Sequence, residues 1–391
     1  MNDRVERIQT LLRSFELPAW LFYDFRGSDP IAYRVLGLDP GGHPTRRWFY
    51  LIPAEGEPVR LVHRIEQGAL GPLPGTKLVY LTWQELRTGL SRMLEGSSRV
   101  AMQYSPLNAI PYFSLVDAGT AELIRSLGPE IVSSGDLIQR FESVWSAKQI
   151  ALHKKAALRI TGIVQEAFYE AHRQIRNSGS ISEFELQTWI MGQLEASGLV
   201  TDFPPIVAVN ENSSDPHYHP KQEASSAIRS GDFLLIDLWA KTKDPAAVFA
   251  DITWTGVFGP PAPEVRKVFE AVRSARDAGV QFLGERRGSA ARIEGWEVDA
   301  AVRRVIVEAG YGDAFVHRTG HNLGEAVHGN GVHFDNLETR DTREVVSGIG
   351  CTIEPGVYLE SFGVRSELNV FIQEDGVEVT TPPQKELIVL A

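Results

Sequence analysis

The sequence predicts an α+β protein with two domains, residues 1–145 and 146–391. Its 391 residues are more than one compact hydrophobic core usually needs. After residue 145, helical patterns are grouped with strand patterns that read as antiparallel pairs, which is typical of an α+β domain. Hydrophobic residues make up 43% of the chain and charged residues 23%, which excludes a disordered, collagenous or coiled-coil chain.

The first domain mixes short strands with helices. Apolar and β-branched runs predict strands, and apolar residues recurring at intervals of three and four predict helices. The expected strands are Trp20–Asp24, Trp48–Ile52, Val59–Val62 and Val100–Tyr104, and the expected helices are Val5–Phe15 and Ala121–Leu127. No acid and histidine cluster with metal-binding spacing occurs here, so we expect a structural or substrate-shaping role for this domain.

The second domain begins with a long amphipathic helix. The expected helices are Ala147–Ile175, Glu183–Glu195, Pro263–Leu283 and Val298–Ala309. Ser182 and Glu185 have the spacing of a capping box, and Pro263 suits the first turn of a helix. The expected strands are Phe233–Trp239, Val248–Phe258, Cys351–Leu359, Val364–Ile372 and Leu387–Leu390.

Charge and cysteine content exclude several classes of function. The chain has one cysteine, Cys351, so an intramolecular disulfide is impossible. The 50 acids against 39 lysines and arginines give a net charge of −11, which disfavours nucleic-acid binding. The amino terminus has no secretory pattern and no stretch reaches 18 apolar residues, so we expect a cytoplasmic protein without membrane partners.

Two aspartates lie where paired strands would bring them together. Asp237 ends the apolar run LLID and Asp251 opens DITWT, with the turn signal Asp244-Pro245 between them. A hairpin centred on Asp244 would place the two aspartates directly opposite, with Cβ atoms about 4.5–5.5 Å apart. Two carboxylates in an apolar setting repel, and burying each one is costly. A cation between them would remove both problems.

The carboxyl-terminal region repeats this arrangement with glutamates. Glu354 lies in TIEPG and Glu367 in GVRSE, and a tight turn around Glu360-Ser361 would bring them opposite each other. Between the two hairpins lies HRTGHNLGEAVH, which holds His317, His321 and His328 at spacings that let them converge on one pocket.

Four carboxylates and one imidazole suit a pair of divalent ions. Oxygen-rich ligation favours Mn²⁺ in geometry, although the order of affinities favours Zn²⁺, and Co²⁺ is a further candidate. Four carboxylates also balance the charge of two such ions. Two metals about 3.5–4 Å apart can hold a bridging hydroxide and polarise a carbonyl group.

The ordered series LLID, DITWT, HRTGH with a histidine seven residues on, TIEPG and GVRSE resembles the M24 metallopeptidases of the pita-bread fold. Within that family it is similar to Xaa-Pro dipeptidase (prolidase) and Xaa-Pro aminopeptidase. The resemblance covers the whole chain, and it implies a creatinase-like mixed α/β domain over 1–145 and a pita-bread catalytic domain over 146–391. Relatives are often dimers, so a homodimer is also expected.

Matched motif by motif, the resemblance implies the site residues. Asp237 would bind one metal, Asp251 and Glu367 would bridge both, and His321 and Glu354 would bind the second. Arg365 would either hold a substrate carboxylate or orient a ligand carboxylate. Glu354 would also carry a proton from the attacking water to the leaving amine. The histidines implied on the substrate side are His217, with His219 as a competitor for its role, His317 and His328.

Three positions depart from the family pattern. Trp239 stands where a small residue is common, Trp254 where arginine is common, and Asn322 where glycine is common. The two tryptophans would either narrow the substrate pocket or fill the core behind the strands. All five expected ligands are retained, so the departures concern the shape of the pocket.

The resemblance implies a dinuclear metallo-exopeptidase whose substrate is a small peptide with proline in the second position. We expect an Xaa-Pro dipeptidase, in which a metal-bridging hydroxide attacks the peptide carbonyl. The alternatives are an Xaa-Pro aminopeptidase acting on longer peptides, a metal-free creatinase-like C–N hydrolase, and a non-catalytic binding protein with the same fold. The last two predict loss of the acidic ligands.

Overall fold

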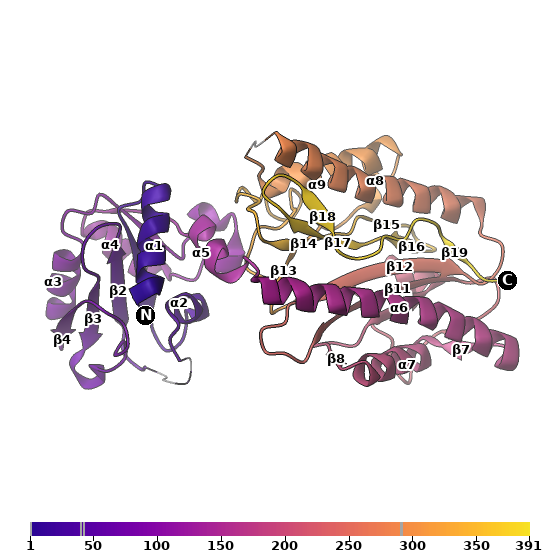
Figure 1. Cartoon of the computed structure of the whole chain (residues 1–391), viewed down its shortest axis with the longest axis horizontal. Coiled ribbons are helices and arrows are strands. Elements are labelled where there is room, and N and C mark those ends of the chain that lie inside the picture. The colour runs from indigo at the N-terminus through magenta and orange to yellow at the C-terminus, as the bar shows by residue number, and fades with distance from the viewer. Residues whose placement is uncertain (1, 40, 42–43, 290–291) are drawn as a thin grey trace. The chain divides into compact units, whose positions relative to one another are not determined.

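The computed structural model describes residues 2–39, 41, 44–289 and 292–391. The chain divides into two compact units, Met1–Glu142 and Ser143–Ala391. Each unit mixes helices with sheets (Figure 1), as expected from the sequence. Within the described residues, no helix combines the length and apolar character that a membrane span requires.

The first unit is built on a six-stranded sheet in the order β4-β3-β2-β1-β5-β6. Alternate residues of β1 point to opposite faces, Trp20 and Phe22 into one apolar cluster and Leu21 and Tyr23 into another, so both faces of the sheet are covered. The strands are β1 Ala19–Asp24, β2 Trp48–Pro53, β3 Val59–His63, β4 Thr76–Tyr80, β5 Arg99–Met102 and β6 Glu130–Ser133, and the helices are α1 Asn2–Ser14, α2 Pro30–Leu36, α3 Trp83–Met93, α4 Ala118–Ser126 and α5 Gly135–Glu142.

The second unit places its strands between two pairs of helices. In Figure 1, α6 and α7 lie on one side of the strands and α8 and α9 on the other. All four helices were expected from the sequence. Their bounds are α6 Ala147–Ser178, α7 Glu183–Ala196, α8 Pro263–Gly288 and α9 Gly295–Glu308.

The caps of these helices follow the sequence signals. The Ser182 and Glu185 side chains form the expected capping box at the start of α7. Pro263 occupies the first turn of α8, where its missing N–H group costs no hydrogen bond. The longest helix, α6, ends at Gly179, whose φ of 82° is the left-handed conformation that glycine adopts without strain.

Short strands surround two longer ones in this unit. The central pair is β11 and β12, joined by β9 and β19. The strands are β7 Ile181–Ser182, β8 Leu199–Val200, β9 Ile206–Val209, β10 Ala227–Ile228, β11 Phe233–Thr242, β12 Ala250–Val257, β13 Asn322–Leu323, β14 Gly350–Ile353, β15 Gly356–Tyr358, β16 Gly363–Arg365, β17 Leu368–Ile372, β18 Val377–Val379 and β19 Ile388–Val389.

Strand alternation decides which residues of β11 and β12 face α6 and α7 and which face the other side of the sheet. Ile236 and Leu238 on β11 and Ile252 on β12 pack in the apolar cluster that includes α6 and α7. The intervening residues, Asp237 and Asp251 among them, therefore point away from α6 to the other face of the sheet. Both aspartates are at least nine-tenths buried there.

The predicted register of the first hairpin is wrong by two residues. Asp237 pairs with Thr253, and Asp251 pairs with Trp239, so the aspartates are diagonal neighbours on one face. The physical reason is the position of the turn. Asp244 begins it, because the Asp244 side chain and carbonyl accept hydrogen bonds from the N–H groups of Ala246 and Ala247, and the hairpin centre moves toward the carboxyl end.

The second hairpin keeps the predicted register but is split in two. Ile353 pairs with Leu368 before the break and Gly356 with Arg365 after it, so Glu354 stands opposite Glu367 as expected. The expected single strands are interrupted at these glutamates. Their N–H groups donate to the carbonyls of other segments, that of Glu354 to Thr319 at 2.8 Å and that of Glu367 to Thr253 at 3.2 Å.

Candidate metal centre and substrate pocket

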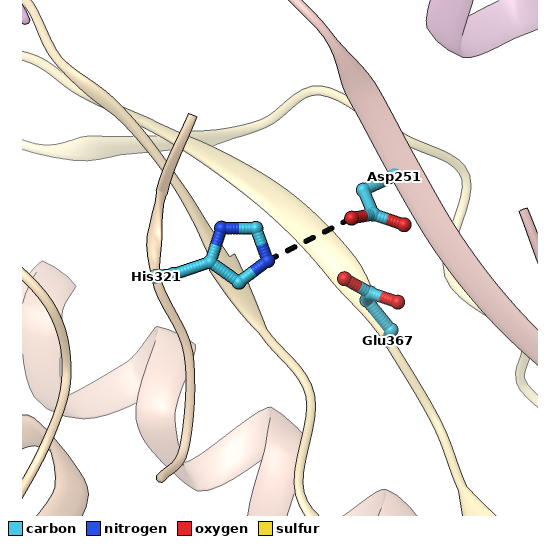
Figure 2. A group of neighbouring side chains, drawn as sticks. All are labelled: Asp251, His321 and Glu367. Atoms are coloured by element: carbon cyan, nitrogen blue, oxygen red, sulfur yellow. Dashed lines mark ion pairs between the residues drawn. The ribbon is translucent and has the colours of Figure 1, made fainter. Parts of the chain in front are cut away.

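Three side chains from separate segments converge inside the second unit. Figure 2 shows the Asp251 and Glu367 carboxylates and the His321 ring pointing toward one another. One ligand atom from each lies within 4.8 Å of the others, and all three residues are buried. The Nε2 atom of His321 is 3.7 Å from Asp251 Oδ2. This spacing leaves room for a cation at the centre of the group.

The backbone around His321 fixes which ring nitrogen faces the acids. Nδ1 lies 3.2 Å from the carbonyl oxygen of Asn322, which can only accept a hydrogen bond, so Nδ1 carries the proton. Nε2 is then left with its lone pair toward Asp251 and toward Glu354 Oε1, which is 3.4 Å away. This tautomer is the one that binds a metal through Nε2.

Asp237 and Glu354 complete the acidic cluster. Arg365 donates from Nη2 to Asp237 Oδ2 at 2.5 Å. Thr352 donates from its hydroxyl to Glu354 Oε1 at 3.1 Å, and Thr253 donates to Glu367 Oε2 at 2.8 Å. Each of these bonds engages one oxygen of a carboxylate and orients the side chain that carries it.

The remaining oxygens of three acids fit a metal centre. Within the described residues, Asp237 Oδ1, Asp251 Oδ1 and Glu367 Oε1 are buried and have no hydrogen-bond partner. Buried acceptors without partners are rare because desolvation is costly. A divalent ion needs this kind of charged oxygen donor, so the residues present fit the implied metals.

Electrostatics lead to the same interpretation. Burial, with repulsion from the Asp237 and Glu354 carboxylates, raises the pKa of Asp251 well above its ordinary value. Burial and the Asp251 carboxylate likewise raise the pKa of Glu367. Burial lowers the pKa of His321, which keeps its ring neutral. Without cations, the cluster would hold protons in place of charge.

One cavity of about 510 Å³ contains the acidic cluster and is lined by the three expected substrate-side histidines, His217, His317 and His328, and by the competitor His219. His217 and His219 both line it, so the two competitors are both at the pocket. His317 Nε2 lies 2.8 Å from the Tyr358 hydroxyl. Burial, together with the nearby Arg365 guanidinium, lowers the pKa of His317 to about 3, so its ring is neutral at pH 7.

The two unusual tryptophans have different surroundings. Trp239 lines the cavity, and its Nε1 donates to Asp202 Oδ1 at 2.7 Å. Trp254 is buried in the apolar cluster beneath α6. The pocket interpretation therefore holds for Trp239 and the core interpretation for Trp254. Asn322, the third departure, donates from Nδ2 to the Gly350 carbonyl at 3.0 Å.

Several residues of the site were not found from the sequence. Arg318, Asp202 and Glu338 line the same cavity. Tyr358 could have been found from the expected strand Cys351–Leu359, because alternation along one unbroken strand would put it on the same side as Glu354, four residues earlier. Its hydroxyl accepts from Arg365 Nη1 at 2.9 Å.

Comparisons with known proteins agree with this geometry. Residues 154–374 match the model of metallopeptidase family M24. A putative dipeptidase, YkvY, of Bacillus subtilis is 30% identical over 265 residues, 67% of each chain. The Xaa-Pro dipeptidase of Lactobacillus delbrueckii subsp. lactis is 27% identical over 65% of this chain and 64% of its own.

A solved structure also matches the fold over nearly the whole chain. The solved prolidase of Thermococcus sibiricus superposes with a TM-score of 0.62 and 26% identity, covering 99% of this chain and 98% of its own. The expected pita-bread fold is thereby confirmed. Since the family model alone covers more than half of the chain, the chain belongs to metallopeptidase family M24 and is a metallo-exopeptidase.

Proposed function

We propose that this chain is an Xaa-Pro dipeptidase with two divalent metal ions. The observation that carries the proposal is that Asp237, Asp251 and Glu367 each have a buried carboxylate oxygen without a hydrogen-bond partner among the described residues. The similar Xaa-Pro dipeptidase and prolidase support the substrate class, a small peptide with proline in second position. Proline peptides lack the N–H group that ordinary peptidases bind, so recognition must rest on shape and on the two chain ends.

The proposal takes over the five ligands and the roles that the family resemblance implies. Asp237 would hold one ion, Asp251 and Glu367 would bridge both, and His321 and Glu354 would hold the second; these five residues supply four carboxylates and one imidazole. The oxygen-rich set favours Mn²⁺, with Zn²⁺ and Co²⁺ as alternatives. When bound, the ions supply an activated water and polarise the peptide carbonyl.

Glu354 has the environment of a proton carrier. In the metal-free site, burial raises its pKa to about 7. A carboxyl group beside an activated water can both accept and release a proton. In hydrolysis, water oxygen bonds to the carbonyl carbon and the carbonyl–proline C–N bond breaks. Glu354 would accept the proton from the water and deliver it to the proline nitrogen. His217, His317 and His328 would hold the substrate across the scissile bond.

The pocket also carries charges suited to both ends of a dipeptide. Asp202 and Glu338 supply negative charge for the substrate ammonium group, and Arg318 supplies positive charge for the carboxylate. For Arg365, the family resemblance left two roles open, holding the substrate carboxylate or orienting a ligand carboxylate. This arginine is buried and already donates to Asp237, Thr253 and Tyr358, so its role is to orient Asp237. Arg318 lines the same cavity as the acidic cluster, and we assign recognition of the carboxylate to it.

A substrate panel tests this proposal. Purified protein loaded with Mn²⁺ would be given Leu-Pro, Leu-Pro-Gly and the proline-free control Leu-Gly, and free amino acids would be measured. We expect release of proline from Leu-Pro, loss of activity with a chelator and recovery on adding Mn²⁺. Cleavage of only the tripeptide would favour an Xaa-Pro aminopeptidase. Failure to cleave any peptide would favour a non-catalytic protein.

A further inference from the structure

Two buried acids outside the expected ligand set hold the segments that carry the substrate-side histidines. We propose that Glu183 and Asp299 are positioning residues: Glu183 fixes the segment with His217, and Asp299 fixes the segment with His317. This inference rests on the proposed function for its kinetic consequence, while its structural part stands independently. Both carboxylates are fully buried.

Glu183 is the first residue of α7, and its carboxylate accepts four hydrogen bonds. Oε1 accepts from the Val209 N–H group at 2.8 Å and from Asn212 Nδ2 at 2.9 Å. Oε2 accepts from the Tyr218 hydroxyl at 2.7 Å and from the Ser226 N–H group at 2.9 Å. All four donors belong to residues 209–226, so one carboxylate ties both ends and the middle of this segment together.

The segment depends on these bonds because it has little regular structure. Residues 210–226 contain one 3₁₀ turn, Asn210–Ser214, and no β-strand. His217 and His219 lie on either side of Tyr218 and line the cavity. The Tyr218 ring packs at the edge of an apolar cluster, and its hydroxyl ends at Glu183. Anchoring this tyrosine therefore places the histidines on both sides of it.

Asp299, on α9, has the same relationship to the segment around His317. Oδ1 accepts from the Thr319 N–H group at 2.9 Å and from the Thr319 hydroxyl at 2.7 Å. Arg303 forms two further bonds with the carboxylate, at 2.9 and 3.0 Å. The same guanidinium donates to the carbonyls of Phe315 and His317, each at 2.8 Å. The backbone on both sides of His317 is thus fixed to α9.

A carboxylate suits both positions because it only accepts hydrogen bonds. An ionised acid offers two oxygens with about four acceptor sites, which matches the four donors at each residue. The corresponding amide keeps the shape, but its NH₂ group would face donors such as Ser226 N–H. Glu183→Gln and Asp299→Asn therefore remove acceptors selectively and leave the volume almost unchanged.

The neighbouring acids of the two helices provide matched controls. Glu185 lies two residues after Glu183 and Glu297 two residues before Asp299, and each belongs to a capping box. Glu185→Gln and Glu297→Gln change the same helix ends without touching either histidine segment. An effect that comes only from losing one negative charge at the helix end would therefore appear in the controls as well.

The experiment combines kinetics with amide hydrogen exchange followed by mass spectrometry. For Glu183→Gln we expect kcat for Leu-Pro to fall by about 10- to 100-fold, because small misplacement of positioned groups is costly to rate. KM and metal content should change less than about threefold. Exchange should rise in peptides covering 209–226 and remain at wild-type rates in peptides covering 315–323. Asp299→Asn should give the reverse pattern.

Several outcomes would overturn the inference. These are wild-type kcat in both variants, exchange rising equally in both segments, or a loss of kcat in the controls as large as in the variants. If Glu183→Gln does not fold, Tyr218→Phe removes only one of the four bonds and should still raise exchange over 209–226. A wild-type protein that cleaves no Xaa-Pro peptide contradicts the proposed function, whereas the exchange pattern still decides the positioning role.

Discussion

Arg365 donates from Nη2 to Asp237 Oδ2 at 2.5 Å, and the pair is buried. Its Nε also donates to the hydroxyl of Thr253 at 3.0 Å, and Thr253 in turn donates to Glu367. One guanidinium thus links two carboxylates of the cluster, one directly and one through a hydroxyl group. The planar fork of arginine makes these contacts together, and a lysine ammonium cannot reproduce them.

Replacing Arg365 with lysine should therefore weaken metal binding. The shorter reach of a single ammonium leaves Asp237 and Thr253 without fixed partners, and losing the supporting bonds of a ligand typically costs about 10- to 100-fold in affinity or activity. Metal content of the purified variant and kcat/KM for Leu-Pro would be measured. Arg273→Lys, at a surface ion pair with Glu270, is the control and should behave as wild type. Full metal occupancy in Arg365→Lys would contradict the orienting role.

Asp251 should be needed for activity but not for folding. Burial among other acids raises its pKa, so the metal-free protein must either take up a proton there on folding or bury a repelled charge, and an uncharged side chain avoids both costs. We expect Asp251→Ala to abolish turnover, and Asp251→Asn to unfold, without metal, at a temperature no lower than that of the wild type. Adding Mn²⁺ should raise the unfolding temperature of the wild type and not of the variants. Retained turnover in Asp251→Ala would refute the assignment of this residue.

Glu354 makes the stability of the metal-free protein depend on pH. Burial raises its pKa from 4.5 to about 7, so the folded chain keeps a proton that the unfolded chain has released in this range. Its contribution to stability is therefore complete below about pH 4.5 and is lost as the pH rises through about 7. Relative to Glu354→Gln, the wild type should lose up to roughly 3 kcal/mol of unfolding free energy. Urea unfolding across this range would measure the difference, and a constant difference would contradict it.

Metal affinity should show the opposite dependence on pH. Ligand carboxylates must be deprotonated to bind, so each proton released strengthens apparent binding by up to about tenfold per pH unit below the pKa. Calorimetric titration of metal-free protein with Mn²⁺ should show affinity rising as the pH rises toward 7. Two buffers with different ionisation enthalpies would count the released protons. Binding that releases no proton at pH 6 would show that Glu354 is not a ligand.

Of the two tryptophans, only Trp239 should affect the substrate preference. Trp239 lines the pocket, and its indole N–H donates to Asp202. Trp239→Ala should therefore enlarge the pocket and shift the preference of the enzyme toward substrates with bulkier first residues. We expect the kcat/KM for such substrates, relative to small ones, to change by about 10-fold or more. Trp254 is buried, and within the described residues its indole N–H has no partner. Trp254→Phe should therefore leave the substrate preference unchanged. A panel of Xaa-Pro dipeptides compares the two variants, and identical preferences would contradict the role of Trp239.

Much of the acidic cluster could be predicted because hairpins are local. Glu354 and Glu367 face each other as expected, since the turn between their strands is short and symmetric about the predicted centre. The aspartate pair shows the limit of this reasoning. An off-centre turn at Asp244 moved the pairing by two residues, yet both carboxylates stayed on one face because strand alternation has a period of two.

Other parts of the pocket could not be predicted. Asp202 precedes β9, and Glu338 lies in a turn organised by Asp335, which accepts from the N–H groups of Leu337 and Glu338. The turn that contains Glu338 is exposed apart from the buried Asp335 side chain, and neither segment has a periodic pattern or a motif. They line one cavity because of long-range packing between the sheet and the helices, and local spacing in the sequence does not predict such packing.

Arg318 should decide whether the enzyme recognises the end of its substrate. If its guanidinium meets the carboxylate of Leu-Pro, then Arg318→Met should raise KM for Leu-Pro by about 10- to 100-fold, as expected for loss of a charged hydrogen-bonding partner. The neutral analogue Leu-Pro-amide lacks that carboxylate, so its KM should be similar in the wild type and the variant. Arg340→Met removes an exposed arginine that lies over Trp296 and serves as the control. Equal losses for both substrates would show that Arg318 supports the site in another way and would remove the present basis for choosing the dipeptidase over the aminopeptidase.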